Sequence, residues 1–154
     1  MARIVAVCIS KSKGTRKRDI KECRLIENHG LEGDAHAGKW HRQVSLLAAE
    51  SIERFNAQGF SIDCGGFGEN LTTEGIDLIS LPVGTKLNIG EGLLLEVTQI
   101  GKVCHRPCAI FRNTGDCILP KEGIFARVLE GGIIKVDDEI SVIERPDSPK
   151  EIAP

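Results

Sequence analysis

Short apolar runs separated by turn residues recur along the chain, and most have the length of a strand rather than a helix. Residues 3–9 form a run of β-branched and small apolar side chains, apolar on both faces, which predicts a buried strand. In residues 93–100 Leu93, Leu95 and Val97 share one face and Glu96 and Thr98 lie on the other, the two-residue period of a strand. A glycine-flanked turn joins this strand to residues 86–89 and predicts a hairpin. Further strand-sized runs lie at residues 23–26, 43–47, 133–136 and 139–143.

One stretch follows the spacing of a helix. Ala48, Ile52 and Phe55 recur at helical intervals, and Gly59 is placed to end the helix. Because many short strands accompany this helix, the pattern favours a mostly antiparallel β-barrel with one or two short helices. The same pattern disfavours a parallel sheet built from alternating strands and helices.

Composition adds limits on size and partners. The 154 residues fit a single domain, and 41% hydrophobic with 27% charged residues is typical of a globular chain. The net charge of −2 gives no general attraction for nucleic acid or an anionic membrane. Neither a membrane span nor a signal peptide is visible, so we expect a cytoplasmic protein. We expect the folded domain to cover residues 1–145, and the proline-rich residues 146–154 to form a flexible tail.

Three loops carry candidate chemistry. Residues 11–18 hold five basic side chains around a glycine, which indicates a solvated hairpin tip, with 23–26 as its returning strand, or an anion-binding loop. Residues 30–38 contain three glycines and cannot form a regular element. This loop and the residues directly after it hold Asp34, His36, Trp40, His41 and Arg42. A second glycine-rich turn, residues 65–70, ends in Glu69 and Asn70.

Three of the six cysteines, Cys104, Cys108 and Cys117, fall within fourteen residues. Together with His105 they could ligate zinc, although adjacent ligands at 104 and 105 are awkward and paired C-x-x-C knuckles are absent. A redox dithiol lacks its C-x-x-C spacing, and three buried cysteines are the plainest alternative. Against burial, His105 and Arg106 make the surroundings electropositive, which favours a reactive thiolate.

An ordered set of motifs resembles the MOSC family, named for the C-terminal domain of molybdenum cofactor sulfurase. The motifs are G-L-E-G-D-A-H-A-G, R-Q-V-S-L-L, G-G-F-G-E-N-L-T-T-E-G-I-D-L, L-P-V-G-T-K-L-N-I-G, K-V-C-H-R-P-C-A-I-F and G-D-C-I-L-P-K-E-G-I-F-A-R-V-L. They run in order from about residue 3 to residue 143, as in a small stand-alone member. The resemblance implies a MOSC-like β-barrel and a cysteine that binds sulfur or the molybdenum of the pterin cofactor.

The resemblance also implies roles for individual residues. The R-x-P-C pattern places the functional, metal-binding cysteine at Cys108, with Cys117 as its rival and Cys104 third. His36 and Arg42 match the family's D-x-H-x-G and R-Q positions, and Glu69 and Asn70 match its G-E-N turn. The plainer interpretation of His36, Glu69 and Asn70 is that they brace loops by hydrogen bonds. Independently of the family, a soft thiolate suits molybdenum, and Arg42, Arg106 and the glycine-rich turns suit a pterin phosphate.

Three functions follow as hypotheses. The first is a protein that binds molybdenum cofactor or carries sulfur as a cysteine persulfide, with a cysteine desulfurase or a molybdoenzyme as a possible partner. The second is a molybdenum-dependent reductase component that acts on N-hydroxylated compounds. The third is a structural or zinc-binding β-barrel module. Whether the chain is an enzyme by itself stays open.

Two expectations concern geometry. Residues 30–38 and 65–70 should lie on the same side of the barrel as Cys108, because one cofactor needs all of them in one cleft. Cys108 should be the most reactive thiol, whereas Cys8, in an apolar strand, and Cys64, with no basic neighbour in sequence, should be inert.

Overall fold

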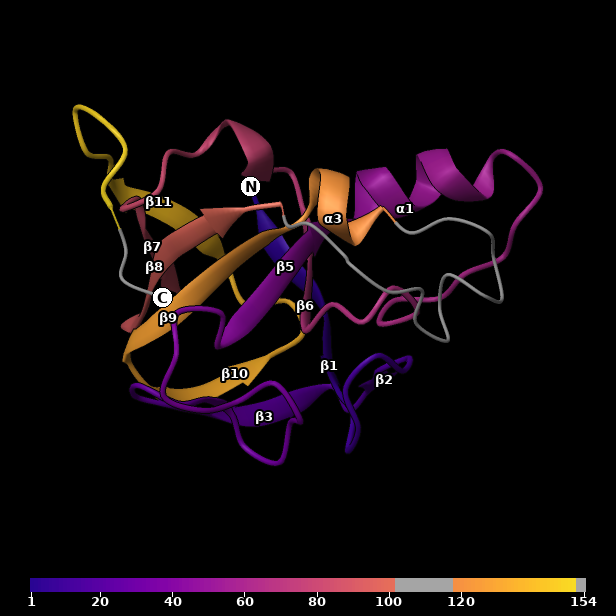
Figure 1. Cartoon of the computed structure of the whole chain (residues 1–154), viewed down its shortest axis with the longest axis horizontal. Helices are drawn as coiled ribbons and strands as arrows, with labels where there is room; N and C mark the ends of the chain where they lie inside the picture. Colours follow the sequence, from indigo (N-terminus) through magenta and orange to yellow (C-terminus); the bar gives the residue numbers. More distant parts are fainter. Residues whose placement is uncertain (102–117, 152–154) are drawn as a thin grey trace.

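The computed structural model describes residues 1–101 and 118–151 and is built mainly from strands (Figure 1). The larger sheet runs in spatial order through β11 (Ile140–Glu144), β7 (Lys86–Ile89), β8 (Leu93–Ile100), β9 (Ile124–Glu130), β5 (Val44–Ala48), β6 (Leu71–Glu74), β1 (Arg3–Ile9) and β2 (Arg18–Asp19). The smaller sheet consists of β10 (Gly132–Lys135), β3 (Glu22–Ile26) and β4 (Gly30–Leu31). Within the described residues every strand pair is antiparallel except β5 and β6. The mostly antiparallel β-barrel predicted from the sequence is thus confirmed.

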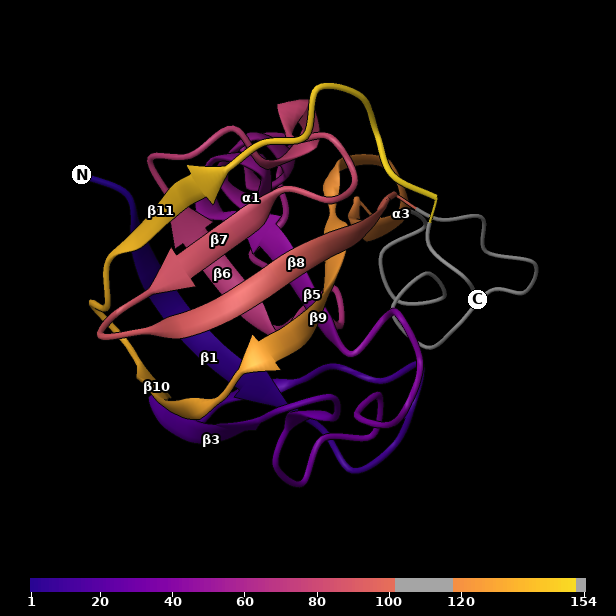
Figure 2. The ribbon, with the colours of Figure 1, turned by 90° about the vertical axis from the view of Figure 1, so that its left-hand side faces the viewer.

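The larger sheet curls until its two ends approach each other (Figure 2). The start of β1 meets the turn before β11, where Arg3 bridges Glu139 and Ile4 N donates to the Asp138 carbonyl at 2.8 Å. Ile140 N in turn donates to the carbonyl of Ala2 at 3.1 Å. These bonds satisfy backbone groups that an open sheet edge would leave unpaired.

The short helices lie together at one end of the barrel (Figure 1). They are α1 (Ala49–Asn56) and α3 (Leu119–Glu122), and a 3₁₀ turn, η1 (Leu78–Ser80), follows β6. The predicted helix is α1, and beyond it a turn reaches Gly59, which has a φ of +107° and whose N–H bonds the Asn56 carbonyl. Ile52 and Phe55 of α1 pack against Leu119 of α3 in a small second core.

The main core fills the barrel interior with aliphatic side chains. Leu87, Leu95 and Val97 are fully buried there, together with Leu46 and Leu71 from neighbouring strands. On β8 the opposite face is covered as well, because Glu96 pairs with Arg127 and Lys150 and the Thr98 hydroxyl donates to the His41 carbonyl. The polar face of β8 therefore lies under other segments of the chain.

The prediction that residues 23–26 return along the first strand is wrong. Only Arg18 and Asp19 of β2 pair with β1. The chain then turns at Lys21, which has a φ of +71°, and β3 leaves to pair with β10 and β4. Pairing with β10 buries Leu25 in the core, which a hairpin partner of β1 alone would not require.

Two further segments complete the description. The expectation that residues 30–38 contain no regular element is wrong at their start, because Gly30 and Leu31 form β4 and pair with Ile26 and Leu25. In the C-terminal segment Lys150 N donates to the Val83 carbonyl at 2.9 Å, and the division of the chain at residue 145 stays a prediction. In the parts described, no helix combines the length and the apolar character that crossing a membrane requires.

Candidate functional site

The three loops singled out in the sequence meet beside the first strand. Lys17 N, in the basic loop 11–18, donates to the carbonyl of Gly65 at 2.8 Å. Gly65 has a φ of +85°, and a Cβ at this position would lie 2.4 Å from the Lys17 carbonyl oxygen. Glycine is therefore required here both for backbone conformation and for the close approach of the two loops.

A buried ion pair joins the basic loop to the loop 30–38. The Lys17 Nζ lies 2.7 Å from Asp34 Oδ1, and both side chains are 0% exposed. The same ammonium group lies 3.1 Å from Ser10 Oγ and 3.0 Å from His36 Nδ1. The expectation of a solvated basic tip is wrong for Lys17, although Lys11, Lys13 and Arg16 of this loop are exposed.

The Asp34 carboxylate holds this corner together. Its Oδ1 also accepts a bond from Ser10 N, and its Oδ2 accepts one from His36 N, both at 3.1 Å. Burial would raise the pKa of this carboxyl, but the hydrogen bond and positive charge of Lys17 outweigh burial and hold the pKa below its usual value. Asp34 is therefore ionised at neutral pH.

Glu69 and Asn70 use their polar atoms within the protein. The Glu69 carboxyl is fully buried and accepts bonds from Gly65 N at 2.8 Å and Phe67 N at 3.1 Å, which closes the turn 65–70. Asn70 Nδ2 donates to the Cys8 carbonyl at 3.0 Å, and its Oδ1 accepts from Ser45 N at 3.0 Å. Both side chains brace the loops, and contact with a cofactor stays a prediction for each.

Burial dominates the ionisation of Glu69. It raises the pKa of this carboxyl to about 7, although the bonds from Gly65 and Phe67 N–H groups act in the opposite direction. The group therefore titrates near neutral pH inside the protein, which a solvent-exposed glutamate would not do.

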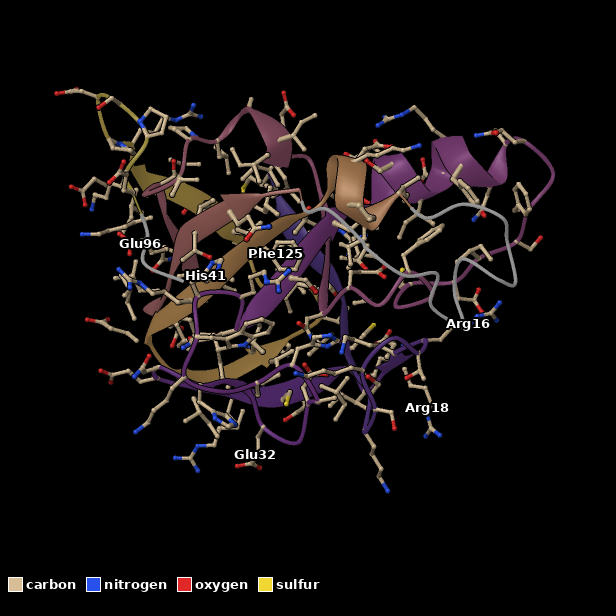
Figure 3. The ribbon with its side chains drawn as sticks, viewed as in Figure 1. Arg16, Arg18, Glu32, His41, Glu96 and Phe125 are labelled. Atoms are coloured by element: carbon tan, nitrogen blue, oxygen red, sulfur yellow. The ribbon has the colours of Figure 1, made fainter. Side chains whose placement is uncertain are left out.

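A basic and aromatic surface adjoins the ion pair. The guanidinium of Arg42 lies 4.6 Å from the ring centre of Trp40 and 5.7 Å from that of Phe125. Lys13 Nζ lies 5.4 Å from the Trp40 ring, and Trp40 Nε1 donates to the His36 carbonyl at 2.7 Å. We call Lys13, Trp40, His41, Arg42 and Phe125 the basic–aromatic surface. In Figure 3 the labels of His41 and Phe125 lie together in front of the barrel strands.

Two nitrogens of this surface are buried without a hydrogen bond among the described residues. They are Arg42 Nε and His41 Nδ1. Burial and then the charge of Arg42 lower the pKa of the His41 imidazole, so His41 is neutral at physiological pH. A buried donor without a partner is costly. Arg42 therefore stands ready to donate to an acceptor brought by a ligand.

Contacts link His36 to the turn 65–70 through Lys17, and they link Arg42 to His36 through Trp40. Sequence reasoning missed the part that Lys17 plays, because a lysine in a run of basic residues carries no local sign of burial. Trp40 and His41 were noticed as neighbours of Arg42 without an assigned role. One sequence feature did point to the Lys17–Asp34 pair, namely the position of Asp34 in a glycine-rich loop. Loops often hold functional residues.

The described cysteines are Cys8, Cys23 and Cys64. Cys8 is fully buried in β1, as its apolar surroundings predict, and burial, followed by the charge of Glu69, raises the pKa of its thiol. Burial also raises the pKa of the Cys64 thiol. Both shifts disfavour the thiolate. Some predictions concern residues outside those described, namely Cys104, His105, Arg106, Cys108 and Cys117. The predicted position of Cys108 beside the loops is one of them.

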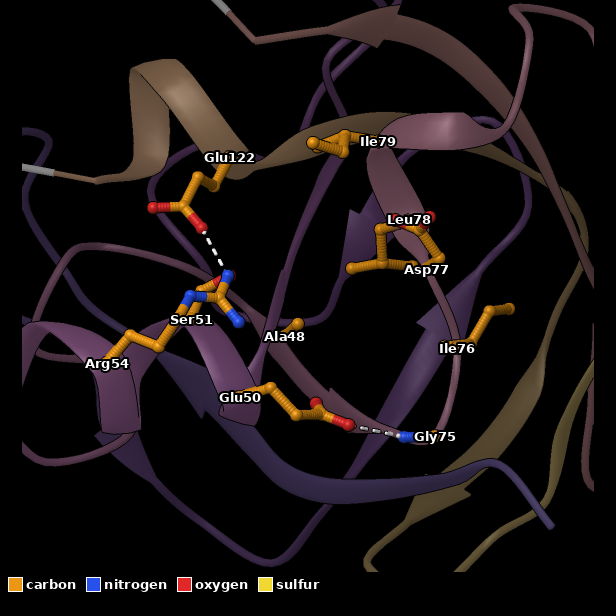
Figure 4. A pocket seen from close by; sticks show the side chains of 10 residues that line it. All are labelled: Ala48, Glu50, Ser51, Arg54, Gly75, Ile76, Asp77, Leu78, Ile79 and Glu122. Atoms are coloured by element: carbon orange, nitrogen blue, oxygen red, sulfur yellow. Dashed lines mark hydrogen bonds and ion pairs between the residues drawn. The ribbon is translucent and has the colours of Figure 1, made fainter.

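A separate pocket of about 300 Å³ lies between α1, α3 and the segment from β6 to η1 (Figure 4). Arg54 and Glu122 face each other across it at 2.8 Å, and Glu50 Oε2 accepts a bond from Gly75 N at 2.9 Å. None of the residues predicted for the site lines this pocket. Within residues 1–101 and 118–151 no group of three histidine, cysteine, aspartate or glutamate residues is placed to hold a metal ion.

Comparison with known proteins decides the family. The model of the MOSC domain matches residues 33–141. The chain belongs to the MOSC domain family. This match begins in the loop 30–38 and spans Arg42, the turn 65–70 and the cysteine cluster, and thus agrees with the resemblance found in the motifs.

Solved structures share the MOSC fold over almost the whole chain. YuaD from Bacillus subtilis has a TM-score of 0.76 at 20% identity, and the match covers 92% of this chain and 96% of that one. YiiM from Geobacillus stearothermophilus has a TM-score of 0.71 at 21% identity, covering 94% of this chain and 76% of that one. YiiM from Escherichia coli has a TM-score of 0.68 at 20% identity, with coverage of 96% and 72%.

A sequence relative is longer than this MOSC chain. A protein named "Reductase" from Gibberella moniliformis is 30% identical over 134 aligned positions, and the match covers 76% of this chain and 23% of that protein. The chain therefore spans about a quarter of the length of this curated relative.

Proposed function

We propose that this MOSC protein binds molybdenum cofactor at the basic–aromatic surface, beside the loop 30–38 that Lys17 connects to the turn 65–70. The observation that carries the proposal is Arg42, whose guanidinium stacks on Trp40 and Phe125 while its Nε is buried without a partner among the described residues. The family match supports the identity of the ligand, because MOSC domains are associated with this cofactor.

The chemistry of the donors suits a phosphate-bearing pterin. Arg42 supplies N–H donors that match phosphate oxygens, and Lys13 adds a second positive charge next to the same indole ring. Since Lys17 pairs with Asp34, the Asp34 carboxylate does not cancel the positive charge of Arg42 and Lys13. His36 and His41 add ring nitrogens that hydrogen-bond to heterocycle edges.

In this proposal the thiolate that binds molybdenum or carries sulfur comes from the cysteine cluster. Cys108 would ligate molybdenum or hold a sulfane sulfur, with Cys117 and then Cys104 as the alternatives, and His105 and Arg106 would favour the thiolate. When bound, the cofactor would supply the redox chemistry of molybdenum. A cytoplasmic location, and a cysteine desulfurase or a molybdoenzyme as sulfur-exchanging partner, belong to the same proposal.

A second candidate is a reductase component for N-hydroxylated compounds. It is favoured by the relative named "Reductase", of which this chain matches about a quarter. Electrons would then come from a separate protein or from further domains. This candidate shares the cofactor site and differs in requiring an electron donor for turnover.

The test is metal and pterin analysis of protein purified from a molybdenum-replete host. We expect molybdenum together with pterin fluorescence after oxidation; stoichiometric zinc without pterin would instead support the zinc-binding module. Arg42→Met should lower molybdenum content about tenfold, the effect of one charge-assisted hydrogen bond. Arg24→Met, at an exposed position of β3, is the matched control and should leave molybdenum content unchanged.

A separate set of cysteine variants tests which thiol is functional. Cys108→Ser should abolish molybdenum or persulfide retention, whereas Cys64→Ser should leave retention at the wild-type level. Loss in Cys117→Ser with full retention in Cys108→Ser would move the function to Cys117. Retention in all three cluster variants would overturn the thiolate mechanism. Reduction of a hydroxylamine compound by loaded protein, dependent on an added electron donor, would favour the reductase candidate.

A further inference from the structure

The buried ion pair also controls a proton on His36. Lys17 Nζ has three acceptors in reach, namely Ser10 Oγ at 3.1 Å, Asp34 Oδ1 at 2.7 Å and His36 Nδ1 at 3.0 Å. An ammonium group carries three N–H bonds and no lone pair, so it donates to each neighbour and accepts from none. The direction of each bond can therefore be deduced from the partners.

The first two partners are acceptors for independent reasons. The Ser10 hydroxyl donates its hydrogen to the Ser12 carbonyl at 3.0 Å, which leaves its lone pairs for Lys17. The Asp34 carboxylate accepts from Ser10 N and His36 N in addition to Lys17, so it carries no hydrogen of its own. One N–H of Lys17 remains, and it is aimed at His36.

His36 must therefore offer a lone pair at Nδ1. Because a neutral imidazole carries one proton, that proton must lie on Nε2. We infer that Lys17 and Asp34 lock His36 in the Nε2–H tautomer, so that Nε2 can act only as a hydrogen-bond donor. Lys17 and Asp34 are positioning residues in this arrangement, since both act through the imidazole.

The tautomer limits what His36 can do. A histidine that binds a metal or takes up a proton through Nε2 needs a lone pair there, and in such sites Nδ1 commonly donates to an oxygen. In this protein Nδ1 accepts, so Nε2 has no lone pair for either task. His36 is suited to an acceptor atom, such as a carbonyl or phosphoryl oxygen. Its use toward the pterin cofactor rests on the proposed function; the tautomer itself does not.

Nuclear magnetic resonance tests the tautomer directly. Protein labelled with ¹⁵N histidine is measured at pH 7.5 in a long-range ¹H–¹⁵N experiment, and His36→Gln identifies the signals of His36. We expect a protonated nitrogen at Nε2 and an unprotonated nitrogen at Nδ1. A proton on Nδ1, a doubly protonated ring, or fast averaging between the two tautomers overturns the inference.

A double variant tests the cause. Lys17→Met/Asp34→Asn removes the donor to Nδ1 and leaves neither charge buried. Its His36 signals should move toward an average of the two tautomers. If the wild type carries the proton on Nε2 and the folded double variant gives the same His36 signals, Lys17 and Asp34 are excluded as the cause of the tautomer. If the double variant does not fold, the wild-type spectrum alone decides the tautomer.

The donor role has a separate readout in loaded protein. Glutamine at position 36 keeps a side-chain N–H near the place of Nε2, whereas methionine has none. We expect His36→Gln to keep molybdenum content within about twofold of wild type and His36→Met to lower it about tenfold. Equal content in the two variants overturns the donor role. Wild-type protein that binds no molybdenum, yet carries the proton on Nε2, would refute the proposed function and leave the tautomer assignment intact.

Discussion

Lys17→Met leaves Asp34 buried without the cation that neutralises it. Both side chains are 0% exposed, so solvent screens the pair little, and the charge left behind cannot reach water without opening the loops. Removing one partner of a buried ion pair costs about 3–5 kcal/mol. For a chain of this size each kcal/mol lowers Tm by about 2–4 °C, so we expect a drop of about 6–20 °C.

The assay is thermal unfolding followed by circular dichroism, with urea titration at 25 °C as a second measure. Lys11→Met changes an exposed lysine of the same loop and should alter stability by less than about 0.5 kcal/mol. Lys17→Met/Asp34→Asn should recover part of the loss, because no unpaired charge remains. A Lys17→Met protein that melts within about 2 °C of wild type would refute the reasoning.

The pH dependence gives a second check on the same variant. In the wild type the pKa of Asp34 lies below its usual value, so Asp34 contributes stability above about pH 4 and this contribution is lost as pH falls through the lowered pKa. Without Lys17, burial is the largest influence left and raises the pKa of Asp34 above the unfolded value. The variant should therefore gain stability between pH 7 and pH 5, and its deficit relative to wild type should shrink.

Three further predictions concern other residues. Gly65→Ala should cost about 2–4 kcal/mol in urea unfolding, because its φ is +85° and the new Cβ would lie 2.4 Å from the Lys17 carbonyl oxygen. A loss below about 1 kcal/mol would contradict this. Because burial raises the pKa of Glu69 to about 7, the free energy of unfolding of the wild type should fall by up to about 3 kcal/mol from pH 4.5 to 7. Glu69→Gln should remove this pH dependence. If the pH dependence is unchanged in Glu69→Gln, Glu69 is not the titrating group. In competitive thiol labelling with peptide mapping, Cys108 should react first and the buried Cys8 last, and the reverse order would refute the assignment.

The strands were predictable because they rest on local patterns. The two-residue alternation of residues 93–100 and the glycine-flanked turn before them require β8 and its hairpin with β7, whatever the rest of the chain does. The partner of β3 was not predictable in this way. Its neighbour β10 lies more than a hundred residues further along the chain, and the pattern of residues 23–26 describes a strand without naming its partner.

Lys17 shows the same limit at the level of the site. In sequence it is one of five basic residues around Gly14, and nothing local separates it from Lys11 or Lys13. What buries Lys17 is its place where the basic loop crosses the loop 30–38, directly opposite Asp34. Tertiary contact, rather than residue type, decides which lysine of the run becomes structural.

The glycine-rich turns show how residue type can mislead about role. Their glycines suggested a cradle for phosphate, but Gly65 permits the close approach of Lys17, and a Cβ on Gly30 would lie 2.7 Å from the Gln43 carbonyl oxygen. The Glu69 carboxylate likewise accepts hydrogen bonds from N–H groups of the turn that contains it. Once these groups are used for bracing, Arg42 remains as the matched residue with a buried donor that has no partner among the described residues. Its neighbour Trp40 holds the guanidinium in place, and Lys17 determines which nitrogen of His36 carries the proton.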